Sequence, residues 1–157
     1  IALMLGTDHP MYLDSDWPTI TTRPHAWYIR VVDIVAFIRT VTPTLNLRMS
    51  ASDLGDYTGE VKVSFGDTGI RISLSDGIIK TVAQWGPTKE NQWANQRQFD
   101  AIFPGLTFLQ LIFGFRSAED LEYAFPDCRT GDAETCALLE TLFPKGASNT
   151  WAPEYPW

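Results

Sequence analysis

The chain has 157 residues, of which 45% are hydrophobic and 20% charged, a balance that excludes a disordered chain and fits one globular domain. A domain of this length buries about 68–70% of its unfolded surface, so it requires neither a metal nor a disulfide for stability. The formal net charge of −7 disfavours nucleic acid and anionic membrane surfaces as partners.

Residues 1–25 carry turn-forming residues and two X-Pro steps, and we expect an arm or interdomain linker here, followed by a domain at 26–157. The start lacks the basic and apolar regions of a signal peptide, and no stretch has the roughly 20 apolar residues of a membrane span. We therefore expect a cytoplasmic chain. Because the first residue is Ile and not Met, we expect a piece of a longer polypeptide.

Residues 27–32 (WYIRVV) are rich in β-formers, which predicts a strand. Asp33 is a suitable N-cap for a following helix, whose apolar pattern continues to Leu45 and fades near residue 49. Pro43 lies inside this pattern. It should either kink the helix or start a second one with Thr42 as its cap.

Three strands with tight turns are predicted next. Residues 60–65 and 70–74 alternate apolar and polar side chains, and 78–85 forms a less regular third strand. The turns GDTG at 66–69 and SDG at 75–77 are strong hairpin signals. One face of this meander is apolar and needs a cover, which the helices must supply. The polar residues 86–98 then predict a long, mobile loop.

The segment 106–115 is apolar on almost every side and predicts a helix that must be covered nearly all round, with Gly114 ending it. Two interpretations remain open: a helix of the core that packs on the apolar face of the meander, or the floor of a hydrophobic groove. Ser117 and Asp120 predict a capping box for a second helix at 118–125. We expect Arg116, between the two helices, to hold helix-end carbonyls.

Asp132 is expected to cap a last helix at 133–143, and the aromatic, proline-containing tail should be extended. Cys128 and Cys136 are expected to be free thiols, because nothing else indicates secretion. Cys128 has no nearby histidine and is a poor candidate for a nucleophile.

No catalytic constellation, cofactor motif or metal site is predicted. His9 and His25 lack metal-ligand spacing, and neither a G-x-S-x-G elbow nor a P-loop occurs. Glu119, Asp120 and Glu122 crowd one helix start, where the helix dipole favours acidic side chains, so we interpret them as solvated capping residues.

Four segments together form a recognisable pattern: WYIRVVDIVAFIRTVTP (27–43), EVKVSF (60–65), FPGLTFLQLIFGFRSAEDLEYAFPDC (103–128) and LLETLFPK (138–145). The pattern resembles the sterol-carrier-protein-like domain at the C-terminus of certain GNAT-type acetyltransferases, an architecture shared by the enhanced intracellular survival protein. The resemblance implies an α+β fold, in which helices pack on one face of a mostly antiparallel sheet of about five strands.

The same resemblance implies a non-catalytic accessory domain, which packs on the acetyltransferase domain of the same polypeptide or protomer, supports a homo-oligomer and shapes the acceptor site. The acetyl-CoA loop of that family, Q/R-x-x-G-x-G/A, is absent from this sequence, so we expect no enzyme activity from the chain alone. The alternative function is a free-standing lipid- or sterol-binding module with an apolar tunnel.

By resemblance, the carboxylate of Trp157 would reach the transferase active site, if Trp157 is the native end of the protein. An apolar ligand would instead occupy the predicted groove. That groove is expected to be lined by Phe65, Ile72, Phe108, Leu109, Leu111, Ile112 and Phe115.

Overall fold

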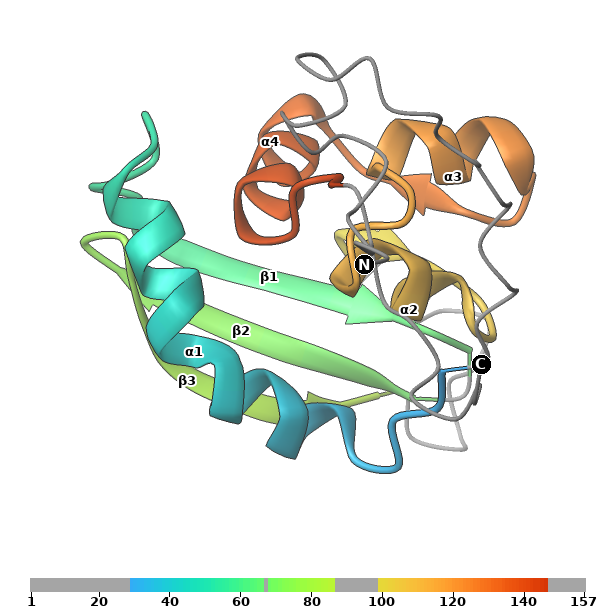
Figure 1. The fold of residues 1–157 in the computed structure, drawn as a ribbon, viewed down its shortest axis with the longest axis horizontal. Helices are drawn as coiled ribbons and strands as arrows, with labels where there is room; N and C mark the ends of the chain where they lie inside the picture. The colour runs from blue at the N-terminus through green and yellow to red at the C-terminus, as the bar shows by residue number, and fades with distance from the viewer. Residues whose placement is uncertain (1–28, 67, 87–98, 147–157) are drawn as a thin grey trace, which may run out of the picture.

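The computed structural model describes residues 29–66, 68–86 and 99–146, which form a mixed α+β arrangement (Figure 1). The helices within these ranges are α1 (Ile34–Ser50), α2 (Thr107–Ile112), α3 (Ala118–Ala124) and α4 (Ala133–Leu142). The strands are β1 (Gly59–Ser64), β2 (Gly69–Ser75), β3 (Ile78–Trp85), β4 (Ala101–Ile102) and β5 (Arg129–Thr130).

The five strands form one sheet in the order β3-β2-β1-β4-β5. Every neighbouring pair is antiparallel except β1 and β4, which run parallel. In Figure 1, α1 and α2 lie on the face of the sheet that is turned towards the viewer. The α+β fold with a mostly antiparallel sheet is therefore confirmed.

The turn between β2 and β3 confirms the second predicted hairpin. Asp76 and Gly77 both have positive φ, 51° and 68°, as a two-residue type I′ turn requires. A Cβ on Gly77 would lie 2.1 Å from the carbonyl oxygen of Gly55, so only glycine fits here. A register shift at Ser73 and Leu74 explains why the sequence of β3 alternates poorly.

The predicted strand at 27–32 is wrong over its described part, because residues 29–32 have no strand structure and Val32 is fully exposed. The outer edge of β3 is already occupied by α1. Arg39 donates two hydrogen bonds to the carbonyl oxygen of Val82, at 2.9 and 2.6 Å, and Asn46 Oδ1 accepts one from the N–H of Ile79 at 2.9 Å. β-forming residues make a strand only where an edge is open to them.

The helix α1 begins as predicted, because the carboxylate of Asp33 accepts a hydrogen bond from the N–H of Ala36 at 2.9 Å. It then continues through Pro43 as one helix, so the alternative of a second helix capped by Thr42 is wrong. The hydroxyl of Thr42 donates instead to the carbonyl of Ile38 within the same helix, at 2.9 Å. Pro43 is exposed, and burial of the opposite face holds the helix together.

The buried face of α1 and the meander share one core with α2 and α4. Phe108 of α2 is fully buried in it, with its ring centroid 5.4 Å from that of Phe65, 6.2 Å from Phe103 and 6.3 Å from Phe143. The helix α1 packs on β3. The apolar face of the meander is therefore covered by helices, as predicted, with α1 as well as the predicted 106–115 helix contributing to the shared core.

The helix ends follow the predicted caps. The helix α2 is shorter than 106–115, and it ends in a Schellman motif: Gly114, with φ of 68°, donates to Leu111, and Phe115 donates to Gln110. Ser117 and Asp120 form the capping box of α3. Asp132 caps α4 through the N–H of Thr135 at 2.7 Å.

The predicted arm at 1–25, nearly all of the predicted loop at 86–98 and the tail with Trp157 lie outside the described residues. The same holds for His9 and His25.

Candidate functional site

Six of the seven residues predicted to line the groove contribute to the core, and one does not. Ile72, Phe108, Leu109 and Leu111 are buried, while Phe65 and Ile112 are partly buried against the same cluster. Phe115 lies outside, with 61% of its surface exposed. The predicted set therefore divides into core side chains, with Phe65 stacked on Phe108, and one aromatic ring at the surface.

Phe115 belongs to a surface cluster at the junction of α2 and α3, which we call the junction cluster: Phe115, Arg116 and Phe125. The guanidinium carbon of Arg116 lies 5.7 Å from the ring centroid of Phe115 and 5.3 Å from that of Phe125. These distances are typical of cation–π contacts. The expectation that Arg116 holds helix-end carbonyls is wrong within the described part of the chain, where its guanidinium contacts the two rings instead.

The backbone around Gly114 positions the junction cluster. The Schellman motif turns the chain sharply out of α2, so Phe115 leaves the core although the residues before it are buried. The capping box then starts α3 at Ser117, and Phe125 follows its last residue. Arg116 stands between the two turns, with its guanidinium against the rings of Phe115 and Phe125.

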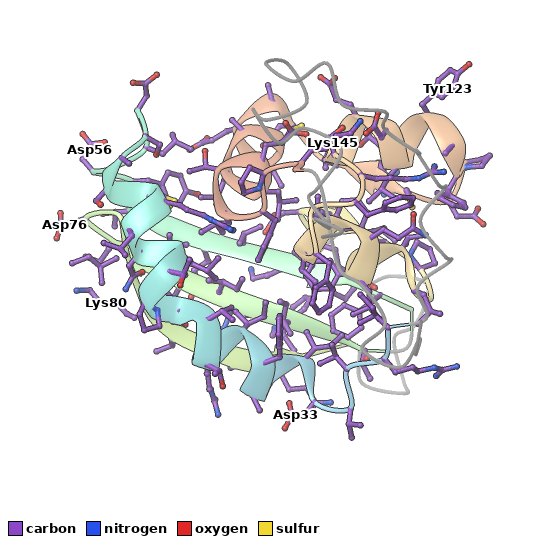
Figure 2. The ribbon with its side chains drawn as sticks, in the orientation of Figure 1. Asp33, Asp56, Asp76, Lys80, Tyr123 and Lys145 are labelled. Atoms are coloured by element: carbon purple, nitrogen blue, oxygen red, sulfur yellow. The ribbon has the colours of Figure 1, made fainter. Side chains whose placement is uncertain are left out.

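The last described residues return to the same junction. The N–H of Gly146 donates to the carbonyl of Gly114 at 2.9 Å, and the ammonium of Lys145 lies 2.6 Å from the carboxylate of Asp120. Figure 2 shows Lys145 beside α3 and α4, while Tyr123 extends from the outer end of α3. Two separate contacts thus hold residues 144–146 against the start of α3.

A second surface feature is an open depression of about 360 Å³ between α1 and β3. Its lining includes Arg39, Thr42 and Lys80 and is partly polar. Because Arg39 is already bonded to the carbonyl of Val82, its guanidinium serves the contact between α1 and β3. No residue of the predicted groove lines this depression.

The two cysteines are free thiols, as expected. Burial raises the pKa of the Cys128 thiol, and a hydrogen bond with Thr107 offsets this only in part. Burial also raises the pKa of Cys136, and the nearby carboxylate of Glu140 adds to the effect. A thiol needs a lowered pKa to act as a nucleophile at neutral pH, so neither cysteine is suited to that role.

The acidic residues in and near α3 either cap a helix or form hydrogen bonds to neighbouring elements. Asp120 bonds to the N–H of Ser117 and to Lys145, and the hydrogen bond with Lys145 is the main cause of its lowered pKa. Glu122 accepts hydrogen bonds from the N–H and the hydroxyl of Thr130, which join α3 to β5. Glu140 of α4 accepts from the N–H of Ala118 at 3.1 Å.

No group of acidic, histidine or cysteine residues suited to holding a metal occurs in the described ranges. Within the same ranges, no helix has the length and apolar character needed to cross a membrane. Comparison with protein families, curated proteins and solved structures gives no match to this chain.

Sequence reasoning missed the junction cluster because it placed Phe115 with the apolar side chains of the predicted groove. The signal was present in the order of residues. A glycine with positive φ at the end of a helix turns the chain, so the residue after Gly114 need not share the buried face of α2.

Proposed function

We propose that the chain is a non-catalytic accessory domain of a GNAT-type acetyltransferase, which packs on the transferase domain, supports assembly and shapes the acceptor site. The observation that carries the proposal is the filled core. The apolar helix that could have formed the floor of a tunnel is used for packing, with Phe108 and Leu111 fully buried. Such a domain acts through its outer surface.

Large apolar side chains on that surface support a packing role. Leu47 of α1 is 70% exposed and Tyr123 of α3 is 95% exposed. Ile78 of β3 is 46% exposed, and the next residue, Ile79, is hydrogen-bonded to Asn46, which precedes Leu47 in α1. Exposed aromatic and aliphatic side chains of this size are typical of contact surfaces between domains.

The chemistry of the polar side chains supports a non-catalytic role. The acidic groups near α3 are engaged in caps and ties, and both thiols have raised pKa values. The fold is also of the class that the resemblance to the sterol-carrier-protein-like domain implies. A transferase domain would have to supply the acetyl-CoA site.

The first experiment is to read the coding sequence upstream of Ile1. The proposal expects a GNAT domain with the Q/R-x-x-G-x-G/A loop in the same reading frame or in an adjacent gene. If one is found, both proteins are produced and their association is measured by calorimetry. Leu47→Glu and Tyr123→Glu place a charge on two different helices, α1 and α3, and at least one should weaken association tenfold or more. Absence of any transferase domain, or unchanged association in both variants, would contradict the proposal.

The alternative function, lipid or sterol binding, is tested with the chain alone. The filled core predicts that an apolar fluorescent probe and a fatty acid bind without saturation and leave the melting temperature unchanged. Saturable micromolar binding that is lost in Ala101→Leu, a substitution that adds volume beside Phe103, would favour the lipid carrier instead.

A further inference from the structure

The path of the chain at Gly146 restricts where the following residues can go. Gly146 is bonded to Gly114, the residue directly before Phe115, and Lys145 is bonded to Asp120. The segment 147–157 lies outside the described residues, and the residue before it, Gly146, is hydrogen-bonded to Gly114, which directly precedes Phe115 of the junction cluster.

The junction cluster offers an apolar ring and a cation together. Phe115 is 61% exposed, and stacking of Arg116 between two rings leaves the edge of the guanidinium available for an acceptor. The ion pair of Lys145 and Asp120 is the only one that joins two residues described by the structure, so Arg116 has no carboxylate partner among the described residues. The cluster therefore fits a segment that carries an aromatic ring and, a few residues away, a carboxylate.

The sequence 147–157 (ASNTWAPEYPW) has that composition. Trp151 lies five residues beyond Gly146, a span of at most about 17 Å in extended chain. Ser148 and Asn149 between them are turn-forming residues, which a return to Phe115 requires. Glu154 follows three residues later, and the prolines on either side limit the entropy lost on docking.

We propose that the segment 147–157 folds back and docks on the junction cluster of its own domain, with Trp151 against Phe115 and the Glu154 carboxylate paired with Arg116. A tether this short gives an effective concentration in the millimolar range, so weak contacts are enough to hold the segment. The proposal concerns the chain by itself and is independent of any transferase domain. It assigns the exposed ring of Phe115 to an internal contact.

The direct test is fluorine NMR on the full chain labelled with 5-fluorotryptophan. Among the resonances of the six tryptophans, Trp151→Phe identifies the one from position 151. Docking predicts that Phe115→Ala moves this resonance to the shift measured in 8 M urea, whereas Tyr123→Ala leaves it in place. A resonance already at the urea shift in the unmodified chain overturns the proposal, and so does one that moves with Tyr123→Ala.

A double-mutant cycle, read out as melting temperatures, tests the same contact. Trp151→Ala is expected to lower the melting temperature by about 2–4 °C in the unmodified chain and by less than half as much in the Phe115→Ala background. Glu154→Gln should show the same dependence on Arg116→Gln, and 0.5 M salt should reduce it. Additive shifts in both cycles overturn the proposal. Because Phe115 and Arg116 lie at the surface, these variants retain the core.

Discussion

The carboxylate of Asp100 accepts a hydrogen bond from the backbone N–H of Lys62 at 2.7 Å. The backbone of Asp100 makes two further hydrogen bonds. Its N–H donates to the carbonyl of Lys62 in β1 at 2.9 Å, and its carbonyl accepts from the N–H of Gly131, the residue after β5, at 2.7 Å. One residue thus joins β1 to the two short strands β4 and β5. The sheet reaches five strands through this connection.

Asp100→Ala is expected to lower the free energy of unfolding by about 1–3 kcal/mol, because the N–H of Lys62 loses its acceptor in a partly buried position. Asp100→Asn keeps an acceptor oxygen and should lose less. Urea denaturation of both variants checks this, with Asp127→Ala, at an exposed position, as the control. Equal stability of Asp100→Ala and the unmodified chain would contradict the role of the carboxylate.

Truncation of the α2 core residues is expected to be severe. Phe108→Ala should cost about 3–5 kcal/mol and Leu111→Ala about 2–5 kcal/mol, because both side chains are fully buried and leave cavities. Leu47→Ala removes a similar side chain at a position that is 70% exposed, and it should change stability by less than about 0.5 kcal/mol. Urea midpoints that stay unchanged in the first two variants would remove α2 from the core.

Gly105 and Gly114 have nearly the same backbone conformation but different surroundings, so alanine at each position distinguishes backbone strain from steric overlap of the added Cβ. Gly114 and Gly105 have φ of 68° and 62°. A Cβ at Gly114 would lie 2.8 Å from the carbonyl oxygen of Pro144, whereas a Cβ at Gly105 meets nothing within 4 Å. Gly105→Ala should cost about 1–2 kcal/mol from the left-handed conformation alone.

Gly114→Ala should cost more than Gly105→Ala, because residues 144–146 must also move. The measurement is thermal unfolding of the two variants side by side. A larger loss in Gly105→Ala than in Gly114→Ala would show that the contact with Pro144 is not tight.

Acid should weaken the caps of α3 and α4. The pKa values of Asp120 and Asp132 both lie below the ordinary value near 3.8. The main cause is the hydrogen bond with Lys145 for Asp120 and the hydrogen bond from the N–H of Thr135 for Asp132. Since the folded state binds the proton less readily than the unfolded one, this stability is present above about pH 3.8 and is lost as the pH falls through the lowered pKa.

The measurement for the caps is urea unfolding between pH 6 and pH 2. Asp120→Asn and Asp132→Asn should be less stable than the unmodified chain at pH 6 and should equal it near pH 2. Asp56→Asn, at an exposed position that caps neither helix, serves as the control. A deficit that stays constant over this range would show that the carboxylate charge is not responsible.

The thiols should react slowly at pH 7. Burial raises the pKa of both Cys128 and Cys136, and Cys128 is only 5% exposed. Labelling with a disulfide reagent should accelerate at least a hundredfold in 6 M guanidinium chloride. Rapid labelling of the folded chain at pH 7 would contradict the raised values.

The capped helices and the hairpins were predictable because their signals are local. The capping box at Ser117 and Asp120, the N-caps Asp33 and Asp132, and the turn at 75–77 each act within four residues. The two short strands were not predictable in this way. A two-residue strand has no alternation to detect, and its formation depends on Asp100 bonding to a strand far away in the sequence.

The junction cluster was only partly predictable, for a related reason. The apolar run of 106–115 indicates burial, but which residue leaves the core depends on the position where α2 ends. That end is fixed by Gly114 together with residues 144–146, which come from another part of the chain. The local sequence shows that a glycine is present, but the contact of Gly114 with residues 144–146, which fixes the end of α2, is a tertiary contact.

The hydrogen bonds from α1 also reduce the number of free backbone groups at the outer edge of β3. Strand edges with free N–H and carbonyl groups are templates on which further chains add and fibrils grow. Here Arg39 and Asn46 take up two of those groups, and the charged side chain of Lys80 lies exposed between them. A second copy could extend the sheet at β3 only after α1 had separated from it. The two side chains that fasten the helix thereby leave fewer free backbone groups at this edge for another strand to pair with.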